Sequence, residues 1–136
     1  MRVDVAFTPE EAGEAPTGIV IDVIRATSTI CQALASGYGR VFCAAEVEEA
    51  RALRAALGGG VLGGERNNVP LDGFDLGNSP REYLEAREGP LVLTTTNGTR
   101  AIVTTAERCE RVLVASLLNL GAVVEAARAH GEDAIV

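Results

Sequence analysis

The sequence predicts an α/β fold, arranged as a three-layer sandwich with a mostly parallel sheet and helices on both of its faces. Short apolar runs rich in β-branched residues alternate with segments of helical periodicity. The runs are apolar at successive positions, as is typical of strands that helices cover on both sides. With 136 residues of ordinary globular composition, the chain is long enough to form one domain with a sizeable core.

Several runs along the chain have the length and composition of buried strands. They are dominated by Val, Ile and Leu, which fit a pleated, covered surface. In chain order the predicted strands are Val3–Phe7, Gly18–Ile24, Val41–Ala44, Val61–Leu62, Leu91–Thr95, Val112–Ala115 and Ala134–Val136.

Helical patterns lie between these strands, and local signals mark several of their ends. Gly37, Gly58 and Gly131 follow the first, second and last pattern, where glycine accepts the left-handed conformation that ends many helices. Ser79 and Glu82 form a capping-box pattern with proline between them, which predicts a helix start. The predicted helices are Thr29–Ser36, Glu46–Leu57, Ser79–Ala86, Thr99–Glu107 and Gly121–Ala129.

We expect residues 1–136 to form a single α/β domain that is incomplete at its C-terminus. Asp133–Val136 begins as a strand and has no helix after it. The one long irregular stretch, Gly63–Asn78, is rich in Gly, Asn and Asp. Loops of that length in compact domains are commonly functional.

The charge pattern limits the partners of this chain. The net charge is -7, and the sequence contains no lysine. Nucleic acids and anionic membranes both require a basic face, so neither is an expected partner. No apolar run approaches the roughly 18 residues of a membrane helix. The three cysteines are widely spaced among apolar neighbours, as expected of reduced thiols in a cytoplasmic protein. A homodimer is left open.

The first polar cluster follows the predicted strand at Gly18–Ile24. Asp22 stands near the strand end, Arg25 adds a planar donor fork, and Thr27 and Ser28 open the next helix. Hydroxyls and free N–H groups at a helix start bind anions, and a neighbouring carboxylate can hold Mg²⁺. The alternative is that Thr27 or Ser28 only caps the helix, as Ser and Thr ordinarily do.

Two further clusters lie in the irregular stretch. Glu65 and Arg66 follow glycines after a short strand and repeat the pairing of an acid with a guanidinium. Asp75 and Asn78 lie in the string Gly-Phe-Asp-Leu-Gly-Asn-Ser-Pro, where the cap function of Ser79 does not account for them. The alternative for Glu65 and Arg66 is a turn with solvated charges.

A fourth cluster, Thr94–Arg100, joins a strand to a helix. Asn97, Gly98 and Thr99 offer an amide, backbone N–H groups and a hydroxyl that suit an anion. Ligands of open α/β sheets bind beyond the carboxyl ends of the strands, so we expect the four clusters to meet at one edge of the sheet. In particular, the Asp22–Thr29 segment and the Asn97–Thr99 turn should lie close together.

Other phosphoryl-transfer signatures are missing from the sequence. There is no P-loop, Asp22 has no second aspartate two residues on, and no cysteine precedes an arginine at the spacing of a cysteine-dependent phosphatase.

Three strings of this chain resemble the 2-phosphosulfolactate phosphatase family. They are VIDVIRATSTI at Val20–Ile30, GGERNN with GFDLGNSP within Gly63–Pro80, and TTTNGTRA at Thr94–Ala101, and SLLNLGAV at Ser116–Val123 fits the family's next segment. The resemblance covers nearly the whole chain in order. Asn67 and Asn68 stand where glycines are expected, although Asn tolerates the same left-handed geometry.

The resemblance implies a Mg²⁺-dependent phosphatase that hydrolyses 2-phospho-3-sulfolactate to 3-sulfolactate and phosphate, a step toward coenzyme M. The alternatives are a phosphatase of another small phosphocarboxylate and a non-catalytic anion-binding domain. In each case the expected partner is a small anion carrying phosphate with sulfonate or carboxylate.

We assign roles to the matching residues on chemical grounds. Asp22 and Glu65 are the expected Mg²⁺ ligands. The catalytic set is predicted to be Asp22, Arg25, Thr27 and Ser28, and the substrate-binding set is predicted to be Arg66, Asp75, Asn78, Asn97, Gly98 and Thr99.

Overall fold

The computed structural model describes all residues 1–136, and its strands form two four-stranded sheets. Sheet A has the order β1-β8-β2-β7, and sheet B has the order β3-β6-β4-β5. All pairs are parallel except β4 with β5. The strands are β1 (Val3–Asp4), β2 (Ala15–Ile21), β3 (Val41–Cys43), β4 (Val61–Arg66), β5 (Val69–Pro70), β6 (Leu91–Thr94), β7 (Cys109–Ala115) and β8 (Ala134–Ile135).

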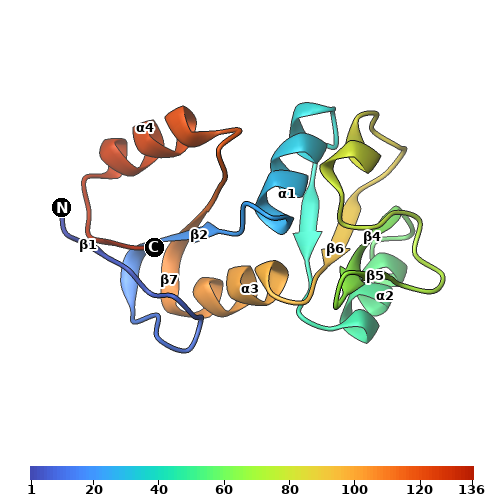
Figure 1. The fold of residues 1–136 in the computed structure, drawn as a ribbon, viewed down its shortest axis with the longest axis horizontal. Helices are drawn as coiled ribbons and strands as arrows, with labels where there is room; N and C mark the ends of the chain where they lie inside the picture. The colour runs from blue at the N-terminus through green and yellow to red at the C-terminus, as the bar shows by residue number, and fades with distance from the viewer.

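The helices form layers with these sheets (Figure 1). Two of them, α1 and α3, contact strands of both sheets and lie between them, while α2 packs on sheet B and α4 packs against β7. None of the helices is both long and apolar enough to cross a membrane. The helices are α1 (Ala26–Ala35), α2 (Val47–Ala56), α3 (Gly98–Arg108) and α4 (Leu120–His130), with the 3₁₀ turn η1 (Pro80–Tyr83).

The predicted α/β class, with mostly parallel strands in a layered sandwich, is confirmed. The structure differs from the expectation of one sheet, because its strands divide between two. Strand composition shows that a segment is covered on both faces, but it does not show which strands pair. Here the pairing separates β2 from β3, which follow one another along the chain.

The two central strands of sheet B, β4 and β6, are buried on both faces, and their successive residues point to opposite sides. Leu91 and Leu93 belong to the core cluster between the sheets, together with Tyr83 of η1. Val92 and Leu62 belong to a second cluster, which they form with residues of α2. Truncating a fully buried leucine such as Leu93 to alanine would cost about 2–5 kcal/mol.

Glycines allow β4 to extend to Arg66, beyond the predicted end at Leu62. A Cβ on Gly63 would lie 2.0 Å from the Tyr83 hydroxyl oxygen, and one on Gly64 would lie 1.9 Å from the Thr94 carbonyl oxygen. Gly64 also has a φ of +144°. Close packing of β6 and η1 against β4 therefore requires glycine at both positions, and it places Glu65 at the end of a buried strand.

A tight hairpin that the sequence analysis did not predict follows β4. Arg66 pairs with Val69, so that only Asn67 and Asn68 form the turn. Their φ angles are 52° and 65°. Positive φ at both central residues is the geometry of two-residue β-hairpin turns, and asparagine accepts it more readily than most residues.

The predicted helix Ser79–Ala86 is shorter than expected. The Ser79–Glu82 capping box is present, but the helical residues are only the 3₁₀ turn Pro80–Tyr83. As expected, Gly131 ends α4, and it does so in the left-handed conformation.

The packing of Gly64 leads to a prediction about stability. Gly64→Ala should destabilise the fold by at least about 3 kcal/mol, because the new Cβ would overlap backbone atoms and the residue has positive φ. Gly121→Ala in α4 is the matched control, because a Cβ there meets no atom within 4 Å. It should change the free energy of unfolding by less than about 1 kcal/mol. Urea denaturation measures both, and equal effects would contradict the packing argument.

Candidate active site

A polar cavity of about 160 Å³ opens where the two sheets meet, and we call it the carboxylate cavity. Its walls come from the β2–α1 turn, the end of β4 with its hairpin, the loop before η1, and the β6–α3 turn. Only one lining side chain is hydrophobic. The lining residues are Asp22, Ile24, Arg25, Glu65, Asn67, Asn68, Asn78, Thr96 and Asn97.

The beginnings of α1 and α3 meet at the wall of this cavity. A Cβ on Gly98 would lie 2.6 Å from Asp22 Oδ2 and 2.4 Å from the Ala26 Cβ. The expected proximity of the Asp22–Thr29 segment and the Asn97–Thr99 turn is therefore confirmed. It is achieved between strands of different sheets, since β2 belongs to sheet A and β6 to sheet B. Gly98 permits this contact and does not itself line the carboxylate cavity.

The hydroxyls of Thr27 and Ser28 are engaged in the β2–α1 turn. Thr27 Oγ1 donates to the Asp22 carbonyl at 2.7 Å and accepts from the Asp22 N–H at 3.0 Å. Ser28 Oγ donates to the Val23 carbonyl at 2.7 Å. Neither residue lines the cavity, so the structure does not support the catalytic roles predicted for them. They fix the backbone that presents Asp22 and Arg25.

Asp22 is a partly buried carboxylate whose charge is poorly compensated. Burial raises the pKa of Asp22, and the nearby negative charge of Glu65 raises it further. The Ala26 backbone N–H and the Arg25 guanidinium act in the opposite direction without cancelling the effect. A cation in the cavity would therefore favour the ionised form of Asp22.

Glu65 is buried but well supplied with hydrogen-bond donors. Its Oε1 accepts from the Thr96 N–H at 2.8 Å. Its Oε2 accepts from the Asn68 N–H at 2.7 Å and from the Thr96 hydroxyl at 3.0 Å. Burial alone would raise the pKa of Glu65, but these donors, with Arg25 nearby, hold it below its usual value. Glu65 is therefore ionised near neutral pH and ties the hairpin to the β6–α3 turn.

Arg25 lies between the carboxylate cavity and a second one of about 240 Å³, which we call the adjoining cavity. The two cavities share Arg25, Glu65, Asn68 and Asn78. The Arg25 guanidinium donates only one hydrogen bond to the protein, to Asn68 Oδ1 at 3.3 Å. Most of its donors are therefore available to an anion.

Asp75 lines only the adjoining cavity. Its Oδ2 accepts from the Leu62 N–H at 2.8 Å and lies 3.9 Å from an Arg54 nitrogen. This carboxylate therefore holds the loop against β4, and its negative charge does not suit contact with an anionic substrate, the role predicted for it.

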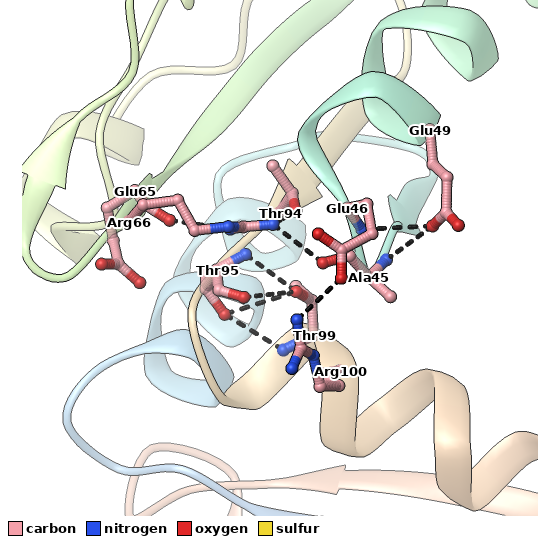
Figure 2. A network of polar contacts seen from close by, with 9 residues as sticks. All are labelled: Ala45, Glu46, Glu49, Glu65, Arg66, Thr94, Thr95, Thr99 and Arg100. Carbon is pink, nitrogen blue, oxygen red and sulfur yellow. Dashed lines mark hydrogen bonds and ion pairs between the residues drawn. The ribbon is translucent and has the colours of Figure 1, made fainter.

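Arg66 points away from the cavity into a separate network (Figure 2). Its guanidinium donates to the carbonyls of Glu65 and Ala45 and to Thr94 Oγ1, each at 2.8 Å. The predicted contact of Arg66 with substrate is therefore not supported. Successive residues of a strand face opposite sides, so Glu65 and Arg66 cannot both face one site from a regular strand.

Thr99 is likewise engaged within its own turn (Figure 2). Its Oγ1 accepts from the Thr95 N–H at 2.8 Å and donates to the Thr95 carbonyl at 3.1 Å. The residue is fully buried and does not line the cavity, so the predicted substrate contact is not supported. Asn97 at the start of α3 does line the cavity, as expected.

Four residues without a function predicted from sequence also line the cavity, namely Thr96, Asn67, Asn68 and Ile24. Thr96 lies within the fourth polar cluster, and the asparagine pair was noted for its tolerance of left-handed geometry. The functional signal of Thr96 and Asn68 is in their backbone N–H groups, which residue type does not reveal.

The oxygen atoms of the cavity fit the coordination of a magnesium ion that binds both protein and substrate oxygens. No group of three or more His, Cys, Asp or Glu side chains converges anywhere in the chain, so a cage made of such side chains is absent. Mg²⁺ is usually held by one or two carboxylates together with water and substrate phosphate. Asp22 and Glu65 supply two carboxylates, and the buried Asn78 Oδ1 beside them has no hydrogen-bond partner.

The hydrogen bonds of Glu65 lead to a prediction about pH. Glu65→Gln should lower the free energy of unfolding by about 1–3 kcal/mol at pH 7, because an amide N–H₂ replaces one acceptor among N–H donors. The pKa of Glu65 is lower in the folded state than its value of about 4.5 in the unfolded state. The stabilisation by Glu65 is therefore fully present above pH 4.5 and declines as the pH falls through the folded-state pKa. The difference between wild type and Glu65→Gln should therefore shrink below pH 4.5.

Urea denaturation at several pH values measures this difference. The exposed Glu110, changed to Gln, is the control and should behave as wild type throughout. A difference at Glu65 that is independent of pH would contradict the assigned ionisation.

Comparison with known proteins agrees with the family resemblance of the sequence strings. The sequence model of the family described as 2-phosphosulpholactate phosphatase matches residues 5–136. A protein of Pseudothermotoga lettingae is 42% identical over 134 residues, covering 98% of this chain and 58% of that protein. Proteins of Thermotoga petrophila and Symbiobacterium thermophilum are each 47% identical, covering 90% and 88% of this chain and 53% and 52% of theirs.

All three relatives bear the name "Probable 2-phosphosulfolactate phosphatase". This chain spans a little over half the length of each of them. Because the match of the family model covers nearly every residue, the chain belongs to the 2-phosphosulpholactate phosphatase family.

Proposed function

We propose that this protein is a Mg²⁺-dependent phosphatase that hydrolyses 2-phospho-3-sulfolactate to 3-sulfolactate and phosphate. The observation that carries the proposal is the convergence of Asp22, Glu65 and Arg25 on one polar cavity from both sheets. Membership of the family and the names of its relatives support this choice of substrate. This reaction is a step of the coenzyme M biosynthesis type.

The cavity offers separate groups for the cation and for the anion. Asp22 and Glu65 are the residues that would hold Mg²⁺. Bound there, the ion would neutralise charge on the phosphate and lower the pKa of a bound water. Arg25 can donate a planar pair of N–H groups to phosphate oxygens, and Asn97 also lines the cavity, where its amide can donate a further hydrogen bond.

Water is the second reactant of the hydrolysis. The water oxygen forms the new bond to phosphorus. The bond between phosphorus and the oxygen on C2 of the substrate breaks, and that oxygen receives a proton. The Arg25 guanidinium is positioned by its hydrogen bond to Asn68 before the substrate arrives, and a preorganised donor of this kind stabilises charge as it develops in the transition state.

The cysteines support a cytoplasmic location, which we also propose. Cys31, Cys43 and Cys109 form no disulfide in the structure. Burial raises the pKa of the Cys43 thiol to about 11, so it is protonated and unreactive near neutral pH. Free thiols of this kind are ordinary in a reducing compartment.

The reaction is tested by phosphate release from 2-phospho-3-sulfolactate. Release should require Mg²⁺, stop with EDTA, and fall by at least about 100-fold in Asp22→Asn. The matched substrate is 2-phosphomalate, in which a carboxylate replaces the sulfonate, and it should be hydrolysed more slowly. Preference for 2-phosphomalate would favour a phosphocarboxylate phosphatase, and binding of either compound without turnover would favour an anion-binding domain.

Two arginines provide a second test, because the structure gives them different roles. Arg25→Ala should raise the Michaelis constant by roughly 10- to 100-fold through loss of a charge-assisted contact, and should change stability by less than about 1 kcal/mol. Arg66→Ala should instead lower the free energy of unfolding by at least about 2 kcal/mol, because it removes the donor of three hydrogen bonds.

Steady-state kinetics and urea denaturation of both variants separate these outcomes. A large loss of stability in Arg25→Ala with an unchanged Michaelis constant would show that Arg25 is structural.

A further inference from the structure

Asn78 has a buried side chain whose oxygen makes no hydrogen bond. The residue is 6% exposed, and its Oδ1 has no partner. The backbone carbonyl of Asn78 accepts from Thr29 Oγ1 at 3.1 Å and anchors the residue. A buried polar group without a partner costs about 1–3 kcal/mol, and such groups in native proteins are rare.

The position of Asn78 points to a ligand. It is one of the four residues that line both the carboxylate cavity and the adjoining cavity. The other buried side-chain atom without a partner, the Tyr38 hydroxyl oxygen, lies in the apolar core between the sheets. Of these two atoms, only Asn78 Oδ1 therefore belongs to a residue that lines a site where a small ligand can enter.

The surroundings of Asn78 indicate which kind of ligand its oxygen meets. The guanidinium of Arg25 is directed to Asn68 Oδ1, and the hydroxyl of Thr96 is directed to Glu65. In the structure no protein donor reaches Asn78 Oδ1. A hard cation held by two carboxylates accepts an amide oxygen as a further ligand, and the side-chain amide can turn about its terminal bond to present that oxygen.

A neutral ligand also suits the charge of the site. Asp22 and Glu65 together carry two negative charges, which balance one divalent cation. A third carboxylate would make the cluster negative and repel the substrate phosphate, whereas an amide oxygen completes the shell without adding charge.

We propose that Asn78, through its side-chain oxygen, supplies an uncharged third protein ligand of the divalent cation held by Asp22 and Glu65. This inference rests on the proposed magnesium site. It changes the role predicted for Asn78 from a substrate contact to a metal contact.

The test measures the binding of Mn²⁺, used as a probe of the cation site, to the purified 136-residue chain without substrate. Free Mn²⁺ is followed by electron paramagnetic resonance. Asn78→Ala should weaken Mn²⁺ binding by about 10-fold or more, and Asn78→Asp should bind Mn²⁺ at least as tightly as wild type. Asn78→Asp should also bind inorganic phosphate more weakly when Mn²⁺ is present, because its added charge repels the anion.

Asn119→Asp is the matched control, since Asn119 is at the N-cap position of α4 and lines neither cavity. It should bind Mn²⁺ as wild type does. Circular dichroism verifies folding, and Asn78→Ser replaces the alanine variant if that variant does not fold.

Two outcomes would overturn the inference in distinguishable ways. Wild-type Mn²⁺ affinity in Asn78→Ala, together with weaker phosphate binding in the metal-free protein, would show that the amide donates to the anion and leave the Asp22–Glu65 site intact. Absence of Mn²⁺ binding by the wild-type chain would overturn the magnesium site of the proposed function as well.

Discussion

The close contact between the beginnings of α1 and α3 determines the geometry of the candidate site. No strand pairing joins sheet A to sheet B, so these two helices carry the connection between them. At their N-terminal ends, Gly98 lies against Ala26 and the carboxylate of Asp22. A side chain at position 98 would separate the two helix ends and move Asp22 away from Glu65.

The two carboxylates of the cavity are in opposite electrostatic situations. Burial and the charge of Glu65 raise the pKa of Asp22, whereas donated hydrogen bonds hold the pKa of Glu65 low. Glu65 is therefore fixed as a charged anchor of the surrounding turns, and Asp22 is the carboxylate that gains most from an incoming cation. With Asn78 beside them, the site combines two negative charges with a neutral oxygen donor.

Arginines take different roles in this lysine-free chain. Arg66 joins β4, β6 and the loop before α2, and Arg100 forms an ion pair with Glu46 at 2.7 Å (Figure 2). Arg25 alone among the arginines lines the carboxylate cavity, where most of its donors are unused by the protein. An acidic protein can thus present one guanidinium to an anionic substrate while other guanidiniums stabilise the framework.

The sequence by itself determined the α/β class, most helices and strands, and the polar turns that form the cavity, because local periodicity, glycine positions and helix caps encode these features. It identified Asp22, Arg25, Glu65, Asn78 and Asn97, all of which line the cavity. Only the tertiary structure decided that the strands form two sheets, since pairing depends on contacts distant along the chain. It also decided that Thr27, Ser28, Arg66 and Thr99 are structural, because their polar atoms find partners within the protein. Residue type shows which groups can bind an anion, but a hydrogen bond inside the fold removes that group from binding, and the fold alone sets those bonds.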